Sequence, residues 1–169
     1  MVLNTSRGVL AEFLVAMALG IDVTQPRVGW ATWDLDWMES PDHSVAIEVK
    51  SAAYLQSWGQ KALSTIQFVV PKRRGFDGAA GETEATPSRH ADVYVFALLA
   101  HKEKPTLNPL HLEQWHFYVL PTDVLDSRTR SQHSITLKSL EDLAGAHVGF
   151  SSLAASVRRA AAEQLGRSG

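Results

Sequence analysis

The sequence predicts an α/β domain with a mixed sheet, because segments with the two-residue period of strands interleave with segments of helical period. The strongest strand, 91–100, is apolar on both faces, which predicts a central place in the sheet. Two earlier segments, 27–37 and 44–50, alternate apolar and charged residues, as strands with one face on the core do. With 169 residues, the chain is expected to form a single domain, 1–169.

The first element is predicted to be a helix that ends at about Leu19, with Gly20 as its C-terminal stop. Asn4, Thr5 or Ser6 can cap its first turn. The residues expected to form its apolar stripe are Leu10, Phe13, Leu14, Met17 and Ala18.

The two charged strands are predicted to form an antiparallel hairpin, because residues 41–44 between them supply turn chemistry. In the second strand, Glu48 and Lys50 share a face opposite an apolar one formed by Val45, Ile47 and Val49. The first strand carries Asp34 and Asp36 on one face. The hairpin would therefore bring Asp34 or Asp36 beside the Glu-x-Lys pair.

The remaining elements follow from shorter patterns and from cap and turn residues. In order, they are expected to be a helix to about Thr65, a short strand 66–70, a flexible loop 71–90 rich in Gly and Pro, a polar loop 101–114, a strand 114–120, a short helix from Pro121, an edge strand 134–137, a short helix capped by Ser139, and a terminal helix from Ser151 or Ser152 to about Leu165.

Composition excludes several classes of protein. Without cysteine there is no disulfide framework, thiolate nucleophile or Cys-ligated zinc. The sequence shows neither a signal peptide nor an apolar run long enough for a membrane span, so no membrane partner and a cytoplasmic location are expected. The net charge of −2 argues mildly against a nucleic-acid binder, although an acidic metal site would lower the net charge.

The hairpin carries the residues that resemble the PD-(D/E)XK nuclease superfamily, whose fold is restriction-endonuclease-like. The matching pieces are Glu12 on the first helix, an Asp on one strand, and Glu48 with Lys50 on the next. Ser51 follows the motif, as it often does in archaeal Holliday-junction resolvases and their relatives. The resemblance covers roughly residues 5 to 100, and its motifs are short.

One departure from the family pattern leaves the strand acid open. Trp33, and not Pro, precedes the first acid, so either Asp34 or Asp36 could be the family's Asp. We favour Asp34, because Asp36 lies nearer the turn, where exposed carboxylates are ordinary.

The resemblance implies a catalytic site for Mg²⁺ or Mn²⁺. Asp34 and Glu48 would be the ligands, together with the carbonyl of Val49, since Mg²⁺ prefers oxygen ligands and keeps several waters. Lys50 would position or deprotonate the attacking water and offset phosphate charge. Glu12 would hold a second metal or a metal-bound water. As structural residues, the same side chains would simply face solvent from a strand edge or a helix.

Other polar residues beyond the motif have both functional and structural interpretations. Gln56 could orient a metal-bound water or bind phosphate, although a role in capping the next helix is slightly favoured. Ser51 could contact the nucleic-acid backbone or end the strand. The basic run Lys72, Arg73 and Arg74 could bind phosphates, whereas charge runs beside Gly-rich loops are more often simply solvated.

These observations predict a metal-dependent endonuclease that hydrolyses DNA, with RNA as the alternative substrate. A non-catalytic member of the same fold that binds nucleic acid or protein is the runner-up. An unrelated α/β domain with an accidental Glu-x-Lys is the third interpretation. Double-strand cutting with one site per chain would favour a two-fold homodimer.

Overall fold

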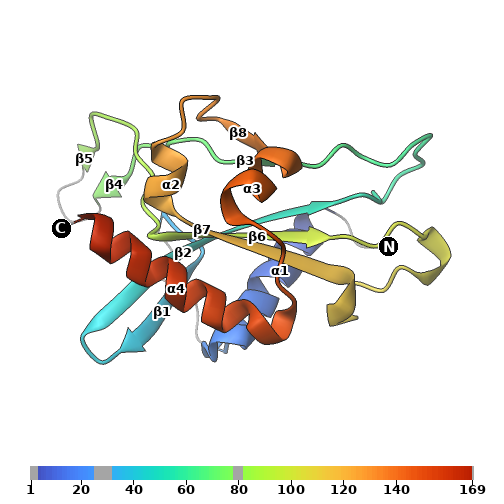
Figure 1. The fold of residues 1–169 in the computed structure, drawn as a ribbon, viewed down its shortest axis with the longest axis horizontal. Coiled ribbons are helices and arrows are strands. Elements are labelled where there is room, and N and C mark those ends of the chain that lie inside the picture. Colours follow the sequence, from blue (N-terminus) through green and yellow to red (C-terminus); the bar gives the residue numbers. More distant parts are fainter. Residues whose placement is uncertain (1–3, 25–31, 78–81, 169) are drawn as a thin grey trace.

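The computed structural model describes residues 4–24, 32–77 and 82–168. Its central sheet has the strand order β1-β2-β6-β7 (Figure 1). The four strands are β1 (Leu35–Ser40), β2 (His43–Ala53), β6 (Val93–Leu99) and β7 (Trp115–Pro121). β1 and β7 run antiparallel to their neighbours, whereas β2 and β6 are parallel. The predicted mixed α/β sheet is therefore confirmed, and β6, buried along its whole length, occupies the predicted central position.

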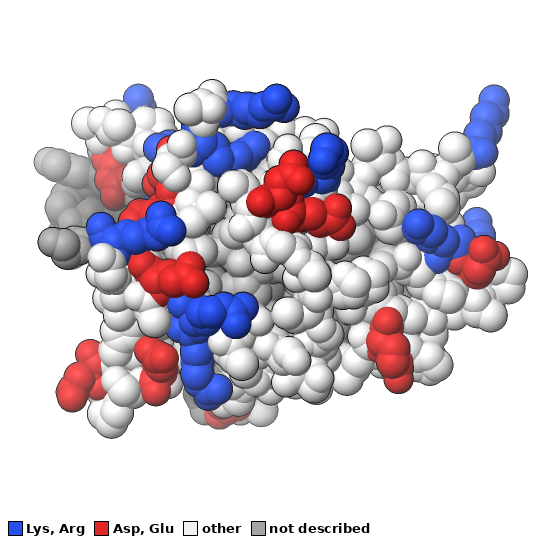
Figure 2. All heavy atoms as spheres, in the orientation of Figure 1, with Lys and Arg blue, Asp and Glu red and all other residues white. Residues whose placement is uncertain are grey.

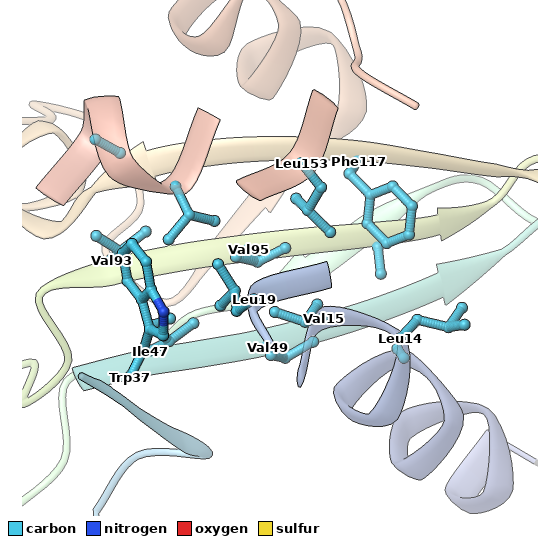
Figure 3. Packing of buried hydrophobic residues seen from close by; sticks show 14 of the residues in the cluster. Leu14, Val15, Leu19, Trp37, Ile47, Val49, Val93, Val95, Phe117 and Leu153 are labelled. Carbon is cyan, nitrogen blue, oxygen red and sulfur yellow. The ribbon is translucent and has the colours of Figure 1, made fainter. Parts of the chain in front are cut away.

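Two helices cover one face of this sheet. They are α1 (Asn4–Leu19) and α4 (Phe150–Ser168), which pack on the apolar face of β2 and β6 (Figures 1 and 3). Figure 3 shows Val15 of α1 beside Val49 of β2, and Leu19 of α1 beside Val95 of β6, within one cluster. None of the helices in the described ranges is long and apolar enough to cross a lipid bilayer.

Shorter elements cover the opposite face of the sheet. A two-stranded sheet, β3 (Gln67–Val69) paired with β8 (Ser134–Thr136), packs there with α2 (Thr122–Asp126) and α3 (Leu137–Ala144). Their apolar side chains form a second core against Phe96 of β6. The sheet thus has two cores, and β6 contributes to both.

The buried face of α1 differs from the prediction. The buried residues are Ala11, Leu14, Val15, Ala16 and Leu19. The predicted Phe13 and Met17 are instead 42% and 45% exposed. The small side chains of Ala11 and Ala16 let the helix approach the sheet closely. Apolar residues occur all around this helix, so the spacing of apolar residues alone did not determine which side faces the sheet. Gly20 has a φ of 69° and ends the helix as predicted.

Two predicted features of the connecting segments were wrong. Residues 54–66 form no helix; they make an irregular loop in which the Ser64 N–H donates to the Tyr54 carbonyl at 3.0 Å. The first turn of α3 is capped by Thr136, whose hydroxyl accepts from the Ser139 N–H at 3.3 Å, and not by Ser139.

Part of the stretch 71–90, predicted to be an irregular flexible loop, is paired in the structure. Arg73 bridges to Ser88, and β4 (Phe76–Asp77) pairs with β5 (Glu82–Thr83). In its described part the segment is an antiparallel ribbon, and its flexibility in solution stays a prediction. The loop 101–114 contains two 3₁₀ turns, η1 (Lys104–Thr106) and η2 (Leu112–Gln114).

The hairpin forms with a shorter first strand than predicted. β1 begins at Leu35, and the pairing runs from Leu35 opposite Ile47 to Ser40 opposite His43. Residues 27–31 of the predicted strand lie outside the described residues, and 32–34 are not in a strand. Asp34 therefore lies just before the start of β1, which determines its contacts with β2.

Candidate active site

Glu48 and Lys50 project from β2 on the face opposite α1, as their alternation with the buried Val45, Ile47 and Val49 predicts. The ammonium of Lys50 donates to Oε1 of Glu48. Glu48 is only 8% exposed and lies beside Tyr94 in the parallel register of β2 and β6. Burial and this contact together hold the two charged groups in one place.

Asp34 is attached to the same part of β2 by two hydrogen bonds. Its backbone N–H donates to the Ile47 carbonyl at 2.9 Å, and its Oδ2 accepts from the Val49 N–H at 2.8 Å. Because the regular pairing of β1 stops at Leu35, the carboxylate of Asp34 takes the place that a strand carbonyl would otherwise occupy. The chain thus fixes the Asp34 carboxylate against β2, next to Glu48.

Asp36 has different surroundings. It is exposed, and its Oδ1 accepts from the indole N–H of Trp33 at 2.7 Å. Of the two acids that the sequence left open, the structure thus brings Asp34, and not Asp36, to the Glu-x-Lys pair.

The electrostatics of the cluster centre on Glu48. Burial raises the pKa of its carboxyl, and the negative charge of Asp34 raises it further, while Lys50 and Arg73 oppose the shift. Burial, with the charge of Glu48 as the next cause, raises the pKa of Tyr94 to about 12, so its phenol stays protonated at neutral pH. Two neighbouring carboxylates in a partly desolvated place favour a cation between them.

The charged groups border a small hollow. Glu48, Lys50 and Tyr94 line it from the sheet, and Arg73 and His90 line it from the ribbon segment. Its volume is about 10 Å³, room for about one water molecule. A single water or a small ion, rather than a large organic ligand, fits this space.

The donor set suits a hard divalent cation that retains much of its water. Asp34 and Glu48 provide two carboxylates, and the alternation of a strand turns the carbonyl of Val49 to the same edge as its N–H, which faces Asp34. Mg²⁺ is commonly bound by one or two carboxylates, with waters and substrate phosphates completing its shell. Within the described ranges, no three His, Asp or Glu side chains converge on a metal-sized position, so the residues present do not form an all-protein cage.

Glu12 lies on α1 and is half-buried. The helix packs on the face of the sheet opposite to Glu48 and Lys50. The charges that act on Glu48 come from Asp34, Lys50 and Arg73. A part for Glu12 in a second metal site stays a prediction.

Ser51 and Gln56 are engaged with protein groups. Ser51 accepts from Nε of Arg7 at 3.4 Å on the α1 side of β2. The amide of Gln56 donates to the Ala53 carbonyl at 3.0 Å and to the Ser64 hydroxyl at 3.1 Å, and its oxygen accepts from Arg7 at 3.5 Å. Burial lowers the pKa of the Arg7 guanidinium. These contacts hold the loop after β2 against α1, and contact of Ser51 or Gln56 with nucleic acid stays a prediction.

The three residues of the basic run after β3 have different surroundings. Lys72 forms an ion pair with Asp126 at 3.1 Å, whereas Arg73 lines the hollow and its N–H donates to the Ser88 carbonyl at 2.8 Å. Arg74 is exposed. Arg73 is therefore the member of the run that lies next to the Glu48–Lys50 pair.

The structure adds residues that the sequence did not indicate. Tyr94 was detectable in principle, because it belongs to the strand that pairs with β2. His90 gave no signal: its Nε2 lies 3.1 Å from the Arg73 carbonyl and 3.4 Å from Oε2 of Glu84, contacts that arise only when the ribbon folds back. Arg89 also lines the hollow; it is fully buried, and its guanidinium donates to the Val70 carbonyl at 2.8 Å.

Comparisons with known proteins gave one structural likeness. No family model and no curated protein matches the chain. A solved structure similar to it is that of a bacterial homing endonuclease, I-Ssp6803I, over 98% of this chain and 99% of that chain, with a TM-score of 0.47 and 17% sequence identity. The mixed sheet flanked by helices is itself the architecture that the resemblance to the PD-(D/E)XK superfamily implies.

Proposed function

We propose that this protein is a metal-dependent nuclease that hydrolyses DNA phosphodiester bonds. The observation that carries the proposal is the attachment of the Asp34 carboxylate to the Val49 N–H, beside the buried Glu48 and its partner Lys50. An accidental Glu-x-Lys would leave these side chains apart and facing solvent. The resemblance to the PD-(D/E)XK nucleases assigns Glu48, Lys50 and one of the two acids, Asp34 or Asp36, to one site.

In this mechanism Asp34 and Glu48 would hold Mg²⁺ or Mn²⁺, with the Val49 carbonyl as a further ligand. The bound ion would supply Lewis-acid stabilisation of phosphate charge and lower the pKa of a coordinated water. The ammonium of Lys50 would position the attacking water, or, once deprotonated, Lys50 would take the proton of that water; the positive charge of the ammonium favours the more negative transition state. The buried Glu48 carboxylate fixes the ammonium of Lys50 at the place of attack.

Groups on both sides of the hollow would receive the substrate. Arg73 contributes a second positive charge at the hollow, where it offsets the charge of the scissile phosphate. Tyr94 keeps its proton at neutral pH and so presents a neutral donor beside Glu48. Lys72 and Arg74, on either side of Arg73, would contact phosphates further along the strand.

A non-catalytic nucleic-acid-binding protein of the same fold is the second candidate. The observation that favours it is the direct contact of Lys50 with Glu48, which occupies both groups at a hollow of only about 10 Å³. In that case the Glu48–Lys50 pair would only stabilise the fold, and Arg73 would bind nucleic acid without taking part in catalysis.

Metal-dependent nicking of supercoiled plasmid and of branched DNA tests the proposal, with a duplex RNA as a third substrate. We expect Mg²⁺- or Mn²⁺-dependent cleavage by the wild type and a loss of about 10²-fold or more in Lys50→Ala. Lys61→Ala, an exposed lysine in the 54–66 loop, is the matched control and should cleave like the wild type. Full activity in Lys50→Ala would remove the central residue from the mechanism. Binding without cleavage by the wild type would select the non-catalytic candidate, and the mass of the protein in solution tests the predicted homodimer.

A further inference from the structure

A second group of positive charges lies beyond the candidate active site, on the α2–β8 loop and the start of α3. Arg128, Arg130 and Lys138 surround a surface hollow of about 570 Å³, to which Thr136 and Ser139 contribute hydroxyls. We call these three basic residues the basic rim. Figure 2 shows Lys and Arg side chains gathered over this loop and the start of α3, along the upper edge of the face, next to acidic side chains.

The basic rim crowds like charges together. The pKa of the Arg128 guanidinium is lowered by burial first, and then by the positive charges of Arg89 and Arg130. Arg89 forms an ion pair with Asp126, and the Arg128 guanidinium donates to the Ser134 carbonyl at 3.3 Å. The acid that lines the hollow is Asp142, which lies 3.5 Å from Lys138, but both side chains are largely exposed. Such an exposed ion pair contributes little free energy, so another anion would readily replace Asp142 beside Lys138. In a chain of net charge −2, this crowding is a local feature that an anionic partner would relieve.

Hydrogen bonds connect the basic rim to the candidate active site. Arg89, which lines the active-site hollow, donates to Oε1 of Gln132 at 2.8 Å. The amide of Gln132 in turn donates to the Arg128 carbonyl at 2.7 Å. The fully buried Arg89 thus fixes the loop that carries the basic rim relative to the Glu48–Lys50 pair.

The charges of the basic rim come from two segments and border a broad hollow, rather than converging on one point. This distribution suits several phosphates in a row better than one free phosphate. We infer that the basic rim binds the phosphate backbone of the nucleic acid at a distance from the bond to be cut. Arg128 and Arg130 suit phosphate through their planar guanidinium groups, and Lys138 adds a point charge. The inference rests on the proposed function, because the basic rim would contact the same nucleic-acid substrate to one side of the bond that is cut.

The experiment measures binding rather than cleavage. A fluorescent 20-base-pair duplex is titrated in EDTA at several salt concentrations with the wild type and with Arg130→Gln/Lys138→Gln. Both residues are exposed, so the double variant should fold. Lys61→Gln/Lys104→Gln is the control, since it removes the same charge from two exposed residues in loops at the other end of the sheet (Figure 1).

We expect the basic-rim variant to bind severalfold or more weakly and to lose about one unit of salt-dependence slope for each phosphate contact removed. The control should bind like the wild type. An unchanged slope in the basic-rim variant, or equal weakening in both variants, would overturn the inference while leaving the proposed nuclease intact. If the wild type binds no DNA in this assay, the inference about the basic rim fails, whereas the nicking assay with metal still decides the proposed nuclease. Equal competition by inorganic phosphate at matched phosphate concentration would identify a single-anion site and would also overturn the inference.

Discussion

On one face of β2, Val45, Ile47 and Val49 pack in an apolar core against α1 and α4. On the other face, Glu48 and Lys50 line a hollow, and Asp34 is bound to β2 beside them. The apolar face stabilises the fold by removing carbon surface from water. On the charged face, burial disfavours the charged form of Glu48, because burial and the charge of Asp34 both raise the pKa of its carboxyl. A group held where its charged form is disfavoured is a candidate for function rather than for stability.

The sharpest test of this comparison substitutes one residue on each face. Ile47→Ala should lower the free energy of unfolding by about 2–5 kcal/mol, since Ile47 is fully buried in the core. Lys50→Ala should lower it by less, because the Glu48 carboxyl, whose pKa is already raised, can take up a proton once its partner is removed, and the substitution should abolish cleavage. Urea denaturation measures the first effect and plasmid nicking the second. Similar losses of stability in the two variants would make Lys50 a structural residue.

A divalent cation should stabilise the charged face alone. At a Mg²⁺ or Mn²⁺ concentration about 100 times its Kd, the folded state should gain about 2.7 kcal/mol, seen as a rise in Tm. Glu48→Gln should remove most of this gain, whereas Ile47→Val, a conservative change on the apolar face, should retain it. Calcium should raise the Tm as well but support little cleavage, because its coordination is looser. Melting that is unchanged at millimolar metal, in the wild type and in Glu48→Gln, would contradict the shared site.

The sequence predicted the sheet and the charged face better than it predicted the packing of the helices. Alternation determines which side of a strand a residue faces, so the faces of Glu48 and Lys50 and the central place of β6 followed directly. On α1, apolar residues occur on all sides, so the helical spacing of apolar residues does not indicate which side is buried. The buried face there depends on the small Ala11 and Ala16, which only the packed structure reveals.

Long-range contacts explain the rest of what the sequence did not predict. The loop after β2 is held by the side chains of Gln60 and Ser64, whose polar bonds have no periodic signal. His90 reaches the hollow only because the ribbon folds back on the sheet. The choice between Asp34 and Asp36 depends on the residue at which the pairing of β1 ends, and no local pattern specifies that residue.

The pH dependence of stability should also distinguish the two faces. The folded-state pKa of Glu48 is raised, so between the ordinary carboxyl pKa and this raised value the folded protein binds more protons than the unfolded chain. The contribution of Glu48 to stability is therefore fully present below the ordinary carboxyl pKa and is lost as pH rises through the raised pKa. Glu48→Gln should flatten this part of a metal-free stability profile, whereas Ile47→Val should only shift the profile downwards. A Glu48→Gln profile parallel to the wild type would contradict the raised pKa.

The smallest expected effect separates the two aspartates. Asp36→Asn should change stability by no more than about 0.5 kcal/mol and leave metal binding and cleavage intact, because the Asp36 side chain is exposed and an Asn oxygen can still accept from the Trp33 indole. Asp34→Asn keeps an oxygen that can accept from the Val49 N–H, so the fold should persist, but it removes a charged metal ligand. It should therefore lose the metal-dependent rise in Tm and also cleavage.

The two substitutions are chemically identical and two residues apart, which makes each the control for the other. Loss of metal binding in Asp36→Asn with retention in Asp34→Asn would transfer the ligand role to Asp36 and show that the hydrogen bond to Val49 serves only to end the hairpin.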